Sequence, residues 1–476
     1  MGVLVKGGTV VNAHQTIKAD VYCEGDKIVA VGKNLEVPSG TKVIDADGRL
    51  VMPGGIDPHT HFELMFMGTV SRDDFFTGTA AGLAGGTTTT IDMCIPDPGQ
   101  PLLDAVHTWK QRAEKAAADF SFHVAVSSWS DRTSDEMGEV VKTHGIPSFK
   151  HFMAYKGAYM VDDDAMLRSF ARARELGAIV NVHCENGDAV AYLQAEVFKS
   201  GVTGPEGHPL SRPVSVEAEA TNRVISIAQI TKTPLYIVHV SCREALEAVS
   251  RARLSGQRVY AEVLGAHLTL DDSVYSSPDF DQAAGFVMSP PFRPKGHCQA
   301  LWNGLQAGHV QVVASDHVTF NREQKRMGLK NFASIPNGTG GIEDRMSLVW
   351  DGGVRSGLLS PEEFVAVTSA NAAKIYNLWP RKGLIAPGAD ADLVVWDPQA
   401  SKTISAKTHH HATDFSIFEG KTVTGLAHTT VARGRVVYSD GRLQAERGTG
   451  RQIKRNAFGA AYAAAVPRAN FSLPVK

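Results

Sequence analysis

Apolar and polar residues alternate in short runs over the first fifty residues of the chain. Runs rich in β-branched residues cover 3–5, 9–11, 19–23, 27–31 and 42–44, and glycine, proline and acidic residues separate them. Apolar runs of this length, bounded by turn residues, are typical of β-strands. Residues 1–52 are therefore predicted to form a small sheet.

The pattern changes near Leu50, and from 53 to 378 apolar strands alternate with helical stretches. This alternation predicts a parallel sheet with crossover helices. The helix expected after the last strand begins with Ser360 as N-cap, a proline at its first position and Glu363 placed to close a capping box. Eight strands in this rhythm predict a closed (β/α)8 TIM barrel. The first strand is expected to end at His61, and the others to cover 87–93, 120–126, 147–152, 179–183, 235–240, 258–263 and 310–316.

The strand pattern returns after residue 378. Strand-like segments lie at 383–396, 423–426 and 434–438. We expect residues 379–450 to complete the N-terminal sheet, which would make the second domain a discontinuous β-sandwich built from both termini. Residues 451–476 show little core pattern and are predicted to be a disordered tail or an arm that reaches a neighbouring subunit.

Composition narrows the functional classes. A length of 476 residues with 43% apolar and 21% charged residues fits one large and one smaller globular domain. A formal net charge of −2 argues against nucleic acid and anionic membranes as partners. The chain has no apolar run of membrane-spanning length, and its N-terminus does not resemble a signal peptide. Five scattered cysteines without CxxC spacing fit reduced thiols, so a cytoplasmic location is expected.

Candidate metal ligands follow the predicted barrel strands. His59 and His61 are two residues apart at a strand end, so their imidazoles can point to the same side. Imidazole and carboxylate groups are good ligands for zinc-class metals. Further candidates stand at the ends of four other strands, namely Lys150, His183, His239 and Asp316. Because barrel active sites are built at the carboxyl ends of the strands, these side chains are expected to meet on one rim.

The same residues lie in longer motifs that resemble the amidohydrolase superfamily. Within it, the chain resembles the cyclic-amide hydrolases, the family of dihydropyrimidinases and D-hydantoinases, along essentially its whole length. The resemblance begins at Val51-Met52-Pro53-Gly54-Gly55-Ile56-Asp57-Pro58-His59-Thr60-His61 and ends near Trp396. Its most specific segments are Ser148-Phe149-Lys150-His151-Phe152-Met153-Ala154-Tyr155, Val287-Met288-Ser289-Pro290-Pro291-Phe292-Arg293, Ala314-Ser315-Asp316-His317 and Ile335-Pro336-Asn337-Gly338-Thr339.

The resemblance implies a site with two divalent metal ions, most simply zinc, although manganese or cobalt suits such ligands too. His59, His61 and Asp316 would bind one ion, and His183 and His239 the other. Lys150 would bridge them as N6-carboxylysine, because an ammonium would be repelled by both ions whereas a carbamate supplies a negative charge and two oxygens.

The family mechanism assigns the remaining residues. A metal-bridging hydroxide would open the cyclic amide, with Asp316 as general base and acid and Tyr155 as oxyanion donor. Ser289 and Asn337 would hold the ring through backbone groups. Apolar residues of two loops, Leu64, Phe152 and Tyr159, would face the ring substituent. The expected products are N-carbamoyl amino acids, formed from 5,6-dihydropyrimidines or 5-substituted hydantoins.

Several alternatives stay open at this stage. Glu63 stands where dihydroorotases carry an arginine for the substrate carboxylate, which argues against an anionic ring acid. An allantoinase-like ureide hydrolase is one rival, and a non-enzymatic assembly protein like the collapsin-response mediator proteins is another. The preferred ring, the role of Val318 next to Asp316-His317 and the physiological pathway (pyrimidine degradation) are not decided by sequence. The family also implies a homotetramer.

Overall fold

The computed structural model of the chain describes residues 2–459. Its centre is an eight-stranded parallel sheet in which each strand pairs with the next along the chain. The strands are β8 (Gly55–Thr60), β11 (Thr87–Cys94), β12 (Asp119–Ala125), β13 (Ser148–Phe152), β14 (Ile179–His183), β15 (Leu235–Ile237), β16 (Val259–Leu264) and β17 (Val312–Ala314). The amide of His61 donates to the carbonyl of His317 at 2.9 Å, and Thr60 forms a parallel bridge with His317. The first and last strands therefore meet, and the predicted (β/α)8 barrel is confirmed.

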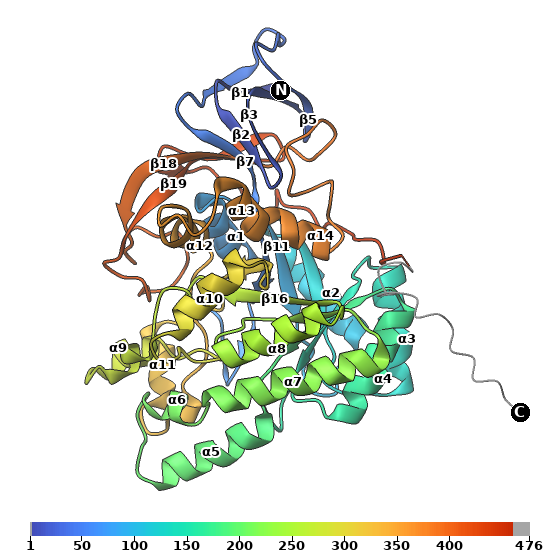
Figure 1. Cartoon of the computed structure of the whole chain (residues 1–476), viewed down its shortest axis with the longest axis vertical. Coiled ribbons are helices and arrows are strands. Elements are labelled where there is room, and N and C mark those ends of the chain that lie inside the picture. The colour runs from blue at the N-terminus through green and yellow to red at the C-terminus, as the bar shows by residue number, and fades with distance from the viewer. Residues whose placement is uncertain (1, 460–476) are drawn as a thin grey trace, which may run out of the picture.

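Helices cover the outside of the barrel (Figure 1). The principal ones are α1 (Phe75–Ala84), α2 (Leu102–Ala113), α3 (Asp131–Lys142), α4 (Asp163–Glu175), α5 (Gly187–Lys199), α7 (Val214–Thr231), α8 (Arg243–Leu254) and α10 (His297–Gln306). Short helices follow in the connections: α6 (Gly207–Leu210), α9 (Phe280–Gly285), α11 (Arg322–Lys325), α12 (Arg345–Val349), α13 (Pro361–Val365) and α14 (Asn371–Ile375). The expected capping box is present at α13, where the Ser360 hydroxyl accepts from the Glu363 amide and the Glu363 carboxylate accepts from the Ser360 amide.

Two further sheets are built from both ends of the chain. One has the order β5 (Lys27–Gly32), β4 (Asp20–Glu24), β1 (Gly2–Lys6) and β6 (Lys42–Asp45). The other has the order β21 (Arg442–Leu443), β20 (Arg435–Ser439), β19 (Thr422–Ala432), β18 (Leu393–Thr403), β7 (Leu50–Pro53), β2 (Thr9–Asn12) and β3 (Gln15–Lys18). Figure 1 shows the N-terminal strands beside β18 and β19, so the C-terminal segment does complete the N-terminal sheet.

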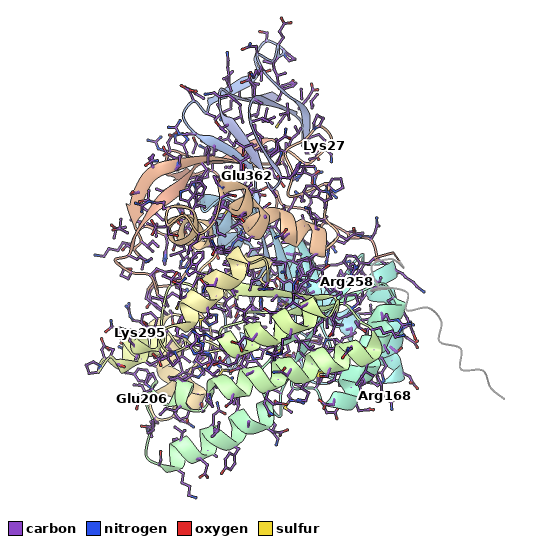
Figure 2. The ribbon with its side chains drawn as sticks, viewed as in Figure 1. Lys27, Arg168, Glu206, Arg258, Lys295 and Glu362 are labelled. Atoms are coloured by element: carbon purple, nitrogen blue, oxygen red, sulfur yellow. The ribbon has the colours of Figure 1, made fainter. Side chains whose placement is uncertain are left out.

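Successive side chains of a strand point to opposite faces, and this explains how the second sheet packs against both the sandwich core and the barrel. Val395 of β18 belongs to the core between the two sheets, together with Val5 and Val51. Its neighbour Trp396 points to the opposite face and contacts Trp350 and Phe364, with ring centroids 5.6 Å away in both cases. Alternate residues of one strand thus bury against the sandwich and against the barrel helices. Figure 2 shows side chains filling the space between these layers, with Lys27 on the sandwich.

Three details differ from the sequence-based expectations. Strand β3 was not predicted, because its four residues are all exposed and carry no apolar alternation. Residues 383–392 are not a strand, and β18 begins only at Leu393. The helix expected after the last barrel strand is interrupted by a π-helical turn at Ala366–Ala370 and ends at Ile375.

The start of the C-terminal stretch is packed against the barrel of its own chain. Ile453 and Arg455 are buried, and the Ile453 amide donates to the Phe120 carbonyl at 2.7 Å. The Arg455 guanidinium donates to the hydroxyls of Ser121 and Ser148. Residues 451–459 are therefore not a disordered tail, the expected contact with a neighbouring subunit stays a prediction, and 460–476 lie outside the described residues. Within the described part of the chain, no helix combines the length and apolar character needed to cross a membrane.

Candidate active site

Six predicted metal ligands converge at the carboxyl ends of the barrel strands. The two Nε2 atoms of His59 and His61 lie 3.2 and 3.1 Å from the same oxygen, Asp316 Oδ1. The His239 ring centroid lies 5.4 Å from that of His59 and 4.5 Å from that of His183. Lys150 ends in the same space, and all six side chains are buried. Residues separated by more than 250 positions therefore form one cluster of nitrogen and oxygen donors.

The backbone is strained at three residues of this cluster and its surroundings. Tyr155, His239 and Asp316 have positive φ angles of 64°, 38° and 49°. Non-glycine residues seldom adopt this left-handed region, and such strain is concentrated at functional sites. The fold thus holds these side chains in directions that a relaxed strand end would not give.

Two buried carboxylates orient the histidines, and the sequence analysis missed both. The Nδ1 atom of His59 bonds to Glu262, which also accepts from the Tyr236 hydroxyl at 2.7 Å and from the His239 amide at 3.1 Å. The Nε2 atom of His183 lies 2.7 Å from Glu185. Each contact leaves the other ring nitrogen available to bind a metal ion, which is the usual arrangement around metal-bound histidine. The sequence did contain a sign of both residues, because Glu262 lies within a buried barrel strand and Glu185 lies just beyond one.

Burial and neighbouring charges shift the pKa values of Glu185 and Lys150. Burial opposes ionisation of Glu185, but Arg212, at 2.6 Å, and His183 hold the pKa of this carboxyl at about 2. Burial also lowers the pKa of Lys150 to about 8, against the opposing effects of Asp316 and Glu262. The Lys150 Nζ atom has no hydrogen-bond partner among the described residues. Burying an amine without a hydrogen-bond partner costs the folded state free energy. Lys150 therefore fits a site in which a bound group contacts its Nζ atom.

All twelve predicted site residues line one cavity. They are the six ligands together with Leu64, Phe152, Tyr155, Tyr159, Ser289 and Asn337. Five more residues complete the wall: Phe66, Ile95, Met288, Val318 and Gly338. Val318, whose role the sequence left open, is part of the lining.

Polar and aromatic groups both line this cavity. Asn337 Nδ2 donates to Ser289 Oγ at 2.9 Å. The Tyr155 ring lies 5.3 Å from His183 and 5.4 Å from Phe66, and its hydroxyl interacts with the Ser289 side chain. Burial raises the pKa of the Tyr155 hydroxyl above its usual value, so this group stays protonated and can donate a hydrogen bond.

Glu63 does not belong to the cavity. Its carboxylate pairs with Lys115 at 2.9 Å and accepts from the Phe75 amide. A second cluster of carboxylates, formed by Asp119, Asp390 and Asp392, does not line the cavity either. The Lys382 ammonium lies 2.7 Å from Asp119 and 3.1 Å from Asp390, so this cluster already contains its cation.

Fold and site together define a class of barrel protein that gathers histidines, a lysine and an aspartate as candidate metal ligands at the carboxyl ends of its strands. The model of the amidohydrolase family matches residues 50–437, and the chain belongs to this family. The confirmed resemblance extends to individual relatives. A dihydropyrimidinase of Dictyostelium discoideum is 50% identical over 459 residues, which cover 96% of this chain and 91% of the relative.

Two bacterial proteins are also similar to this chain over nearly its whole length. A D-hydantoinase of Geobacillus stearothermophilus is 44% identical over 459 residues, covering 96% of this chain and 97% of that protein. The crystal structure of a dihydropyrimidinase from Brevibacillus agri superposes with a TM-score of 0.95 at 43% identity, covering 96% of this chain and all of the other. The likeness therefore includes the barrel and the sandwich sheets together.

Proposed function

We propose that this protein opens cyclic amide rings by hydrolysis, acting on 5,6-dihydropyrimidines and 5-substituted hydantoins. The observation that carries the proposal is the convergence of His59, His61, Lys150, His183, His239 and Asp316 on one small-molecule cavity. Its support from outside is the similarity, over 96% of the chain, to proteins named dihydropyrimidinase and D-hydantoinase. The products would be N-carbamoyl amino acids.

The donor set fits two divalent metal ions, for which zinc is our assignment. His59, His61 and Asp316 would hold one ion, and His183 and His239 the other. When bound, such a pair polarises the substrate carbonyl and activates water. The histidines are already oriented through Glu262 and Glu185, which supports a preformed site.

Lys150 would bridge the ions after carboxylation. A pKa near 8 leaves part of this amine neutral at physiological pH, and the neutral nitrogen is the form that adds carbon dioxide. The new N–C bond forms as the nitrogen loses one proton, which leaves a carbamate anion. The unpartnered Nζ atom supports this assignment.

The other residues would act directly on the ring. Asp316 would take a proton from the attacking water and return it to the ring nitrogen as the C–N bond breaks. Tyr155 would donate a hydrogen bond to the carbonyl oxygen as negative charge develops there. Backbone groups of Ser289 and Asn337 would hold the ring. Leu64, Phe66, Phe152 and Tyr159 would face its substituent.

Replacing Tyr155 by phenylalanine tests the oxyanion assignment. Loss of one such donor is expected to lower kcat by about 10²–10³-fold with little change in KM. Steady-state kinetics on dihydrouracil would measure this. Tyr192→Phe is a matched control because Tyr192 is 65% exposed. Full activity of Tyr155→Phe would remove Tyr155 from the mechanism.

The proposed reaction is tested by ring opening of dihydrouracil and of a 5-aryl hydantoin by zinc-loaded protein. Turnover of at least one ring is expected, with loss of activity after chelation and recovery when zinc is returned. The ratio of the two kcat/KM values would then identify the preferred ring. Failure with both rings in protein that binds two metal ions would contradict this substrate class, and protein without metal would contradict the enzymatic assignment.

The assembly and location are also proposals. We infer a homotetramer in the cytoplasm, acting in pyrimidine degradation. The exposed side chain of Phe198 on α5 supports contact with another subunit. The five cysteines are unpaired thiols, which supports a reducing compartment.

A further inference from the structure

Lys325, the last residue of α11, has an unusual environment for a lysine. It is 1% exposed. Its Nζ atom donates three hydrogen bonds to backbone carbonyls, at 2.8 Å to Val287, 2.7 Å to Pro336 and 2.8 Å to Gly338. Among the described residues, no carboxylate lies within ion-pair distance of it.

The three partners identify the protonation state. Carbonyl oxygens only accept, so three such bonds require three N–H donors, which only the ammonium form has. Burial works in the opposite direction and lowers the pKa of Lys325. A charge buried without a counter-ion is costly to the folded state. The hydrogen bonds from the ammonium to the backbone of neighbouring segments must therefore compensate for this cost.

The three carbonyls belong to two segments that line the active-site cavity. Val287 precedes Met288 and Ser289, while Pro336 and Gly338 stand on either side of Asn337. The segments also bond to each other, because the Gly338 amide donates to the Val287 carbonyl at 2.9 Å. Asn337 Nδ2 adds the side-chain bond to Ser289. Lys325 is thus the charged centre of the junction that presents Ser289 and Asn337.

We propose that Lys325 is a positioning residue for substrate binding, which fixes the two segments whose backbone groups hold the cyclic amide. This inference rests on the proposed function. Without the ammonium, three buried carbonyls lose a charge-assisted partner, and the segments carrying Ser289 and Asn337 can separate. The metal ligands lie on other elements, so metal binding and the chemical step depend less on Lys325.

The test compares Lys325→Met with wild type. Methionine keeps most of the side-chain length and removes the donors. We expect KM for dihydrouracil to rise at least tenfold, kcat to change less than threefold and bound metal, measured by elemental analysis, to stay unchanged. Lys330→Met is the matched control, since Lys330 is an exposed lysine five residues along the chain. Unchanged KM in Lys325→Met would overturn the inference.

A second variant separates positioning from general stability. Lys325→Ala leaves space for three carbons and a nitrogen, so n-propylammonium added to the assay is expected to lower KM again, whereas n-propanol, with a single O–H donor, is not. Equal effects of both additives would overturn the role of the ammonium.

If Lys325→Met does not fold, Lys325→Gln takes its place. Glutamine keeps two N–H donors, so an intermediate KM is expected. Inactive wild-type protein would overturn the proposed function and this inference together, whereas active wild type with unaltered variants overturns the inference alone.

Discussion

Replacing Lys150 by methionine is expected to abolish binding of the two proposed metal ions and to lower ring-opening activity by at least about 10³-fold, because the proposed bridging ligand and its negative charge would be lost together. Methionine has a similar volume, so the 0% exposed site should keep its packing. Metal content by elemental analysis and kcat/KM for dihydrouracil measure the two effects.

The stability of the same variant separates the bridging role from a structural one. The Lys150 Nζ atom has no hydrogen-bond partner in the described part of the chain. If it had no metal to bind, removing a buried unpaired amine would raise the melting temperature and leave activity intact. We expect the opposite in metal-loaded protein, where loss of the ions lowers the melting temperature. Lys156→Met is the matched control, because its side chain is 57% exposed and pairs with Asp188.

The residues at the strand ends could be predicted because a local pattern determines them. His59 and His61 are two apart at a strand end, and His183 ends a buried apolar run, so the strand period and the barrel topology bring them to one rim. The strand alternation likewise predicted the barrel and the return to β structure. A barrel strand can be recognised in the sequence because its residues are buried and therefore form an apolar run.

The residues that support these ligands could not be found in this way. Glu262 bonds to His59 across 203 positions of the chain, and Lys325 reaches Val287 across 38. Neither contact follows from periodicity, because charged residues are ordinarily exposed and only the closed fold shows which of them are buried. Arg455 is a similar case, since its segment lacks an apolar pattern although the side chain is buried beneath the barrel strands.

Replacing Asp316 by asparagine is the second change with a large expected effect. The carboxylate is the point where His59 and His61 converge, and its strained backbone, with φ of 49°, holds it toward the cavity. Asparagine preserves shape but accepts a proton poorly and carries no negative charge. We expect kcat to fall by at least about 10³-fold, because the proposed proton transfer to the leaving nitrogen would be lost together with part of the proposed metal affinity.

Measuring metal affinity and kcat in parallel distinguishes the two contributions of Asp316. If the aspartate acts as ligand only, excess zinc should restore activity once the site is saturated. If it also transfers the proton, saturated Asp316→Asn stays slow, and this is the outcome we expect. Asp440→Asn serves as control, since the Asp440 side chain is 72% exposed, pairs with His428 and accepts a hydrogen bond from Ser439. Wild-type kcat in saturated Asp316→Asn would assign the proton transfer to another group, and Tyr155 would be the next residue to test because its hydroxyl lines the same cavity.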